Sequence, residues 1–152
     1  MPLATLICLV VAIHDGDTLT ARCGNATNYQ QVRLRVAAID APESQQAFGQ
    51  KSREHLARLC FRQQAMLQPV EKDKYGRTVA HVRCGGTDVA AAQVSAGMAW
   101  VYMPYAVDRP GLTVLQDRAR AQRTGLWSQP RPQAPWTYRH KYARQESQGS
   151  SA

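Results

Sequence analysis

The pattern of apolar and polar positions in the first forty residues predicts three β-strands. Residues 6–13 and 18–23 are rich in β-branched and apolar side chains, and His14-Asp15-Gly16-Asp17 between them is a strong hairpin signal. Residues 31–39 alternate apolar and polar side chains, which is the period of a half-buried strand. We therefore expect two paired strands and then a third, with Arg35 on the face opposite the apolar set.

The rest of the chain predicts a mixture of helices and strands. In chain order these are a helix of roughly three turns between Pro42 and Cys60, strands over 64–70 and 78–82, a short helix capped by Asp88 and stopped by Gly97, and a helix from Leu112 to about Gly125. This order fits an α+β, β-rich fold, namely a five-stranded, antiparallel OB-fold Greek-key barrel with about three packed helices.

The chain divides by composition into a domain and a tail. We expect residues 1–128 to form one domain, because 152 residues with 44% hydrophobic content support a single core. Residues 129–152 are rich in proline and end in small polar residues, so we expect a largely disordered tail that only Trp136 and Tyr138 are placed to anchor.

The net charge of the chain indicates a polyanionic partner. Nineteen Lys and Arg residues against 11 Asp and Glu give a formal charge of +8. Such a balance is typical of proteins that bind nucleic acid, although a solvated basic surface is the alternative. The apolar run over residues 3–13 is too short to span a bilayer, so we expect no membrane partner.

The four cysteines lack the close CxxC pairing and companion histidines of a zinc site. Cys8 and Cys23 are placed symmetrically about the predicted hairpin turn, within disulfide reach, and that pairing would leave Cys60 with Cys84. This favours an oxidising compartment, and we expect a periplasmic or secreted protein whose signal peptide lies outside this sequence. A cytoplasmic protein with four buried free thiols is the alternative.

Candidate chemistry lies in two turn-like segments, Asp15-Gly16-Asp17 and Asp40-Ala41-Pro42-Glu43, where the scarce carboxylates concentrate. Clustered carboxylates repel one another and are tolerated most easily around a cation, and oxygen ligands favour calcium or magnesium over zinc. Either segment alone also suits a hairpin or a helix start. With Arg35 and Arg77 able to grip a phosphate, the set contains the parts needed for phosphodiester hydrolysis.

Three motifs in register resemble the staphylococcal nuclease (thermonuclease) family. They are Asp15-Gly16-Asp17-Thr18, Arg35-Val36-Ala37-Ala38-Ile39-Asp40-Ala41-Pro42-Glu43 and Asp73-Lys74-Tyr75-Gly76-Arg77. The likeness covers about Ala4 to Trp127. It implies a calcium-dependent, sugar-nonspecific nuclease that hydrolyses DNA and RNA at the 5′ oxygen and leaves 3′-phosphates, with magnesium a less expected cofactor.

Carried over position by position, the resemblance assigns three groups of residues. The ligands of one calcium ion are Asp17, Asp40 and the Ala41 carbonyl. Asp15 lies next to these ligands without binding the ion directly. The catalytic residues are Arg35 and Arg77, which bind the scissile phosphate, and Glu43, which orients or deprotonates the attacking water. The substrate-binding residues are Lys74 and Tyr75 at a terminal phosphate, and Tyr102 and Tyr105, which occupy the region of the family's base-packing tyrosines with different spacing.

Two other functions stay open at this level. A non-catalytic OB-fold module would bind nucleic acid through the same basic groove, but it would gain nothing from carboxylates that repel phosphate. An exported interaction domain held by disulfides would show no metal-dependent thermal shift. We expect a monomer in each case.

Overall fold

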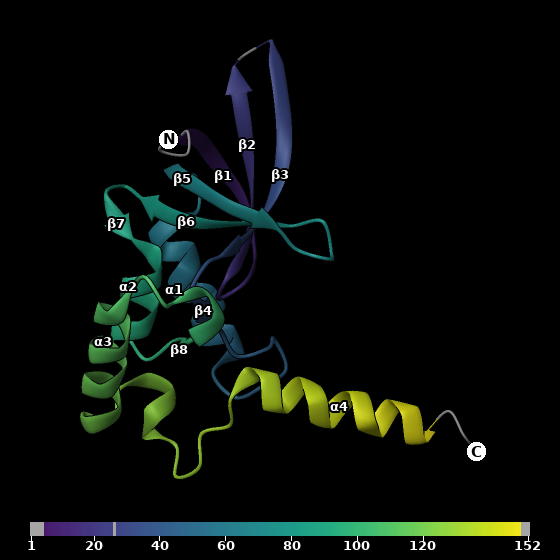
Figure 1. Cartoon of the computed structure of the whole chain (residues 1–152), viewed down its shortest axis with the longest axis vertical. Helices are drawn as coiled ribbons and strands as arrows, with labels where there is room; N and C mark the ends of the chain where they lie inside the picture. The colour runs from purple at the N-terminus through teal and green to yellow at the C-terminus, as the bar shows by residue number, and fades with distance from the viewer. Residues whose placement is uncertain (1–4, 26, 150–152) are drawn as a thin grey trace.

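Five long strands close into a barrel in the computed structural model, which describes residues 5–25 and 27–149 (Figure 1). The strands are β1 (Leu6–Asp15), β2 (Thr18–Asn25), β3 (Asn28–Val36), β5 (Gln64–Lys72) and β6 (Thr78–Cys84). They pair in the order β3-β2-β1-β5-β6, and β3 also pairs with β6, which closes the sheet. The five-stranded barrel is confirmed. The β3–β6 pairing is parallel, however, so the expectation of antiparallel pairing throughout was wrong at this one seam.

The three expected helices pack around the barrel. They are α1 (Gly49–Cys60), α2 (Val89–Ser95) and α3 (Pro110–Ala121). The side chain of Asp88 caps α2 by accepting a hydrogen bond from the Ala91 amide, as its position in the sequence predicts. Short elements complete the domain: β4 (Ile39–Asp40), β7 (Thr87–Asp88), β8 (Trp100–Val101), η1 (Met103–Tyr105) and η2 (Gly125–Ser128).

The predicted third strand is divided in the structure. It was expected to run over 31–39, but β3 ends at Val36 and residues 39–40 form the separate strand β4. Ala38 adopts a positive φ of 74°, and the Ala37 amide bonds to the Ala80 carbonyl of β6. This bend takes the chain out of the barrel and pairs β4 with β8. Asp40 is thereby carried towards the helices at one end of the barrel.

Two disulfides cross-link the domain in the predicted pairing. Cys8 and Cys23 face each other across β1 and β2, with Cα atoms 4.4 Å apart. Cys60 at the end of α1 is bonded to Cys84 at the end of β6. Both bonds join elements that also share the buried core, which includes Leu19, Leu34 and Leu56. The second one ties the principal helix to the sheet.

The turn of the first hairpin is clamped by two helices. The buried side chain of Gln93 on α2 donates to the Gly16 carbonyl at 2.7 Å and to the Ser52 carbonyl of α1 at 3.1 Å. A Cβ atom added at Gly16 would lie 1.7 Å from the Ser52 Oγ and 2.9 Å from the Ala41 Cβ. Gly16 is not among the residues with a positive φ, so backbone conformation does not require glycine here. The close approach of α1 does, because it leaves no room for a side chain.

Gly16→Ala is therefore expected to destabilise the protein by about 1–3 kcal/mol, the usual effect of overpacking a filled site. Gly111→Ala is the matched control, since no atom lies within 4 Å of a Cβ added at that position on α3. Urea unfolding of both variants measures the difference. Equal stability of the two variants would contradict the close packing described for the hairpin turn.

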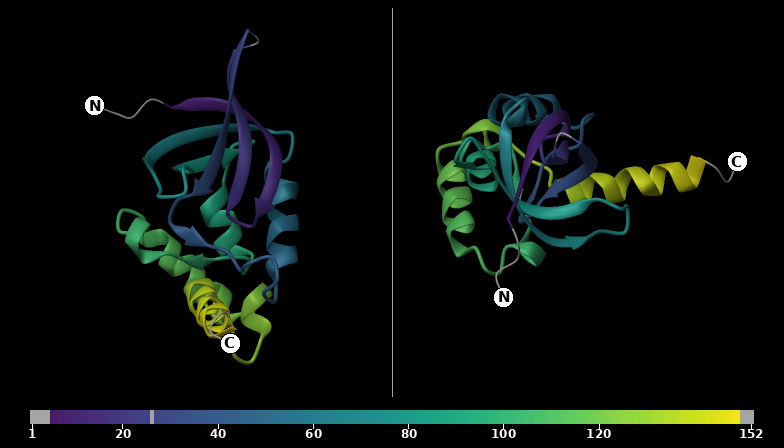
Figure 2. Two further views of the ribbon diagram at one scale, coloured as in Figure 1. Left: turned by 90° about the vertical axis from the view of Figure 1, so that its right-hand side faces the viewer. Right: turned by 90° about the horizontal axis from the view of Figure 1, so that it is seen from above.

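The tail differs from its expectation. Residues 135–149 form a fourth helix, α4 (Pro135–Gly149), although composition predicts a largely disordered segment. Trp136 packs against Trp100 and Tyr102, with ring centroids 5.6 and 6.2 Å apart, and so acts as the expected anchor. Tyr138 instead packs on Tyr142 within the helix. Figure 1 and the right-hand view of Figure 2 show that α4 projects away from the barrel.

The division between a domain ending at residue 128 and a tail stays a prediction.

Among the described residues, no helix has the length and apolar character needed to cross a bilayer.

Candidate active site

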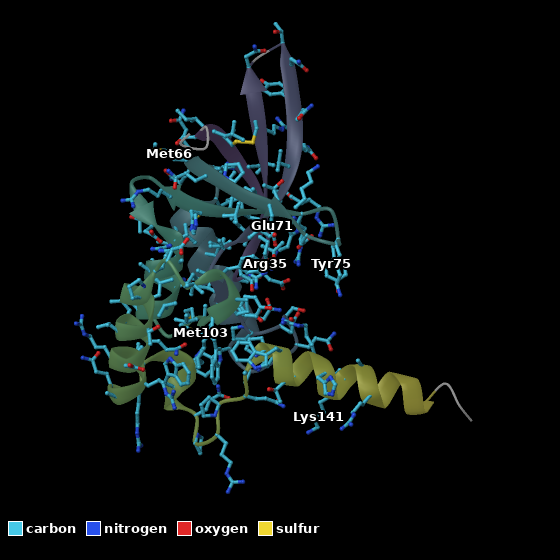
Figure 3. The ribbon with its side chains drawn as sticks, viewed as in Figure 1. Arg35, Met66, Glu71, Tyr75, Met103 and Lys141 are labelled. Atoms are coloured by element: carbon cyan, nitrogen blue, oxygen red, sulfur yellow. A yellow bond between two sulfur atoms is a disulfide. The ribbon has the colours of Figure 1, made fainter. Side chains whose placement is uncertain are left out.

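One cavity of about 870 Å³ lies at the end of the barrel where the hairpin turn, the segment after β4, the β5–β6 loop, η1 and α4 meet. The residues nominated from the sequence, cysteines apart, all line it: Asp15, Asp17, Arg35, Asp40, Ala41, Glu43, Lys74, Tyr75, Arg77, Tyr102 and Tyr105. In Figure 3, Arg35 lies at the centre of this region, and Tyr75 lies at the tip of the β5–β6 loop above α4. The structure thus brings residues from five separate segments to one place.

Two buried aspartates form the centre of the cavity. Asp17 is 6% exposed and Asp40 is 1% exposed. The Oδ2 of Asp17 accepts a hydrogen bond from the Ala41 amide at 2.7 Å, and its Oδ1 accepts one from the Thr18 hydroxyl at 2.8 Å. The hairpin turn and the segment after β4 are therefore joined directly through a carboxylate, which fixes the orientation of Asp17.

Arg35 bridges these two aspartates. Its guanidinium nitrogens lie 3.5 Å from the Asp17 Oδ2 and 3.5 Å from the Asp40 Oδ1. Leu34 and Val36 on either side point into the core, so the alternation of β3 directs Arg35 to the opposite face, as the sequence predicts. A hydrogen bond of 2.8 Å to the Val36 carbonyl holds the guanidinium in place. The result is a fixed, half-buried positive charge at the cavity floor.

Glu43 lies at the edge of the same cluster and is oriented by its own backbone. The Glu43 amide donates to the side chain of Gln46 at 3.1 Å, and the Glu43 carbonyl accepts from the Gln46 amide at 2.9 Å. This tight turn precedes α1 and leaves the carboxylate facing the cavity. The position of the Glu43 carboxylate relative to Asp40 is therefore set by a defined turn.

Burial controls the protonation of the acidic cluster. Desolvation raises the pKa of Asp40, of Glu43 and of Asp15, and the neighbouring charge of Asp17 raises all three further. Nearby arginines oppose the shift at Asp40 without reversing it. A group of carboxylates held in this way is stabilised by any cation that enters among the oxygens.

The raised pKa of Glu43 gives a pH-dependent prediction. Folding raises this pKa above its usual 4.5, so protonated Glu43 favours the folded state, and that contribution is lost as pH rises through the folded value. Glu43→Gln should therefore melt at a higher temperature than wild type near neutral pH in the presence of chelator. The difference in Tm should disappear below about pH 4. A difference that stays constant from acid to neutral pH would argue against a raised pKa.

The β5–β6 loop presents a second arginine to the cavity. Asp73 Oδ1 accepts hydrogen bonds from the backbone amides of Tyr75 and Arg77, each at 3.0 Å. Asp73 Oδ2 accepts from the Arg77 Nε at 2.8 Å. The Tyr75 ring lies 5.2 Å from the Lys74 ammonium and 5.4 Å from the Arg77 guanidinium. One aspartate thus builds the turn and aims Arg77, while Lys74 and Tyr75 stay exposed at the rim.

An aromatic wall borders the cavity on the side of η1. The rings of Tyr102 and Tyr105 are 5.7 Å apart, and the Tyr105 hydroxyl donates to the Glu71 carboxylate. Trp136 extends this wall from α4. The wall shows that Tyr102 and Tyr105 are placed together beside the acidic centre despite their unusual spacing in the sequence.

Sequence reasoning missed Arg139, which enters the cavity from α4. Its Nη1 and Nη2 donate to the two oxygens of Asp40 at 3.1 and 2.7 Å, and its Nη1 lies 2.5 Å from the Glu43 Oε1. These partners raise the pKa of Arg139. Its place three residues after Trp136, an expected anchor, was the only signal in the sequence.

The amino-acid sequence matches the family model described as "Staphylococcal nuclease homologue" over residues 33–129, which is more than half of the chain. The chain belongs to this family. The resemblance read from the three motifs is confirmed, and the matched residues include Arg35, Asp40, Glu43 and Arg77. The first hairpin turn precedes the matched residues, and α4 follows them.

Relatives from bacteria match most of the length of this chain. Micrococcal nuclease of Shigella flexneri is 43% identical over 140 residues, which are 86% of this chain and 78% of that protein. Protein ParB of Escherichia coli is 37% identical over 151 residues, 92% of this chain and 82% of its own. An uncharacterized endonuclease of Haemophilus influenzae is 40% identical over 134 residues, 88% and 73% of the two chains.

The oxygen donors of the cavity fit the hard divalent cation that this family implies. Among residues 5–25 and 27–149, no group of three His, Cys, Asp or Glu side chains is arranged as a metal centre. The available protein donors are the carboxylates of Asp17 and Asp40, which Arg35 bridges, and the backbone carbonyl of Ala41, which lines the same cavity. Few protein ligands, all oxygen, suit calcium or magnesium, because these ions keep water or phosphate in their remaining positions.

Proposed function

We propose that this chain is a calcium-dependent, sugar-nonspecific nuclease that hydrolyses phosphodiester bonds of DNA and RNA at the 5′ oxygen and leaves 3′-phosphates. The observation that carries the proposal is the single cavity in which a buried aspartate pair, Glu43 and two arginines converge. Relatives named as nucleases or endonucleases support the general activity. The basic charge of +8 suits a polyanionic substrate.

Asp17, Asp40 and the Ala41 carbonyl would hold the calcium ion, with Asp15 adding negative charge behind them. When bound, the ion supplies Lewis-acid polarisation of the phosphate. Arg35 is fixed beside the aspartates, so a phosphate entering there meets a guanidinium that needs little reorganisation.

Glu43 and Arg77 complete the reacting geometry. The carboxylate of Glu43 orients the attacking water and accepts its proton, and a raised pKa makes it a better base than an ordinary surface glutamate. Arg77 binds a phosphate oxygen from the loop opposite Arg35, where its charge offsets the negative charge that builds up in the transition state.

The rim of the cavity would hold the rest of the nucleic acid. Lys74 and Tyr75 are exposed beside Arg77 and would contact a terminal phosphate. Tyr102 and Tyr105 would stack on a base, an interaction that tolerates every base because each has a π face. None of these contacts reads the ribose 2′-hydroxyl, which is consistent with cutting of both DNA and RNA.

The test is cleavage of single-stranded DNA, duplex DNA and RNA of matched sequence in calcium, in magnesium and in chelator, with the product ends mapped. We expect cutting of DNA and RNA in calcium, weaker cutting in magnesium, none in chelator, and 3′-phosphate ends. Cutting that persists in chelator would contradict the metal dependence. Binding without cutting in every metal would make the chain a nucleic-acid-binding OB-fold module.

We also propose that the protein acts as a monomer in an oxidising compartment, periplasmic or extracellular. The two disulfides support this location, because such bonds persist where thiols are not kept reduced.

A further inference from the structure

Helix α4 delivers a third guanidinium to the acidic centre. Arg139 is bonded to both oxygens of Asp40 and also to Glu43, so one side chain engages a proposed metal ligand and the proposed base together. Paired, parallel hydrogen bonds of this kind are among the stronger contacts of a carboxylate. Arg139 lies outside the residues 33–129 that match the family model.

The segment before Arg139 is fastened over the Asp40–Glu43 turn. The Gln133 carbonyl accepts a hydrogen bond of 2.6 Å from Gln46, whose Oε1 also holds the Glu43 amide. Pro135 is buried, and Trp136 packs against Tyr102 of the aromatic wall. We call residues 133–139 the strap.

Beyond the strap, α4 leaves the protein. Residues 139–144 are exposed, and Figure 1 and the right-hand view of Figure 2 show the helix projecting from the rest of the protein. The Arg139 side chain is 46% exposed, against 14% for Arg35, which is also tied to the backbone of its own strand. Arg35 is therefore the more deeply buried of the two guanidiniums, and Arg139 reaches the cavity from an otherwise exposed helix.

Arg139 and a divalent cation require the same negative charges. Asp40 has both oxygens engaged by Arg139, and Arg35 lies 3.5 Å from one of them. A cation that approaches Asp40 meets a carboxylate already neutralised, and it is repelled by the guanidinium that neutralises it.

We propose that Arg139 sets the divalent-cation affinity of this site, acting as a built-in counter-cation that the strap holds on Asp40 and Glu43 and that must be displaced for the cation to bind. This deepens, and rests on, the proposed function. A strap closed about nine-tenths of the time lowers the apparent affinity about tenfold, because only the open fraction binds. The freed guanidinium then faces the cavity, where the substrate phosphate is its natural partner.

The test compares calcium binding by wild type, Arg139→Ala, Arg139→Lys and Trp136→Ala, followed as the rise in Tm with calcium concentration in the absence of nucleic acid. Arg131→Ala is the matched control, because it removes the same charge from an exposed tail position that does not line the cavity. We expect Arg139→Ala to bind calcium about tenfold more tightly or better. Trp136→Ala should shift in the same direction, Arg139→Lys should be intermediate, and Arg131→Ala should match wild type.

Equal or weaker calcium binding by Arg139→Ala would overturn the proposal, as would an equal gain in Arg131→Ala, which would show a general charge effect. Cleavage by wild type in saturating calcium is measured on the same preparations. Normal cleavage by wild type, with no gain in calcium affinity in Arg139→Ala, would contradict the proposed role of Arg139 but not the nuclease function. No calcium binding by any variant, together with no cleavage in calcium, would overturn both.

Discussion

Arg77→Ala is expected to lower the turnover number on single-stranded DNA by about 10²–10³-fold, because one preorganised donor to the transition state contributes an effect of that size. The fold should survive, since Arg77 lies in a turn and its side chain is 24% exposed. Arg77→Lys should recover only part of the loss, because an ammonium cannot reproduce the planar fork that Asp73 aims at the cavity. Steady-state kinetics in calcium, with circular dichroism of each variant, measure this.

Arg83→Ala is the control for this prediction. Arg83 lies on the neighbouring strand β6 and does not line the main cavity. Its substitution by alanine removes the same charge as Arg77→Ala. It should keep turnover close to wild type. Turnover of Arg77→Ala within a few-fold of Arg83→Ala would mean that Arg77 has no part in the reaction.

Reduction of the two disulfides is expected to destabilise the protein by about 3 kcal/mol for each bond, from the loops of 15 and 24 residues that they close. Together the two losses are comparable with the whole stability of a typical domain, about 5–15 kcal/mol. The second bond should matter more in practice, since it ties α1, and with it Ser52 and the clamped hairpin turn, to β6.

Thermal unfolding with and without reductant checks this prediction. The paired variants Cys8→Ser with Cys23→Ser, and Cys60→Ser with Cys84→Ser, assign the loss to each bond. A reduced protein that melts within a few degrees of the oxidised one would contradict the structural role of both disulfides, and it would remove the support they give to an oxidising compartment.

Local signals explain why most of the barrel could be predicted. The hairpin around Gly16 combines a turn motif with two apolar strands, and symmetry about Asp15-Gly16 predicts Cys8 opposite Cys23. The structure reaches that pairing through two register shifts between β1 and β2, which the sequence pattern does not indicate. The alternation around Arg35 fixes the face on which its charge lies. In these cases neighbours in the sequence carry the information, so periodicity and turn chemistry suffice.

Other features depend on contacts between distant segments. Gly16 is required by Ser52 of α1, and β3 ends before a bend at Ala38, whose positive φ no local pattern indicates. Arg139 lies 99 residues from Asp40 in the chain. The tail composition predicts disorder because it cannot bury much apolar surface, whereas the structure contains helix α4, whose Trp136 packs against Trp100 and Tyr102.

Glu43→Gln separates binding from cutting at this site. A labelled single-stranded oligonucleotide should be titrated in calcium into wild type and into the variant, with anisotropy and product formation followed in the same samples. Both proteins should bind it with similar affinity, and only wild type should release shortened products at an appreciable rate, because the glutamine cannot accept a proton from water. Equal cutting by both proteins, or tight binding with no cutting by either, would contradict the role of this cavity as a hydrolytic active site.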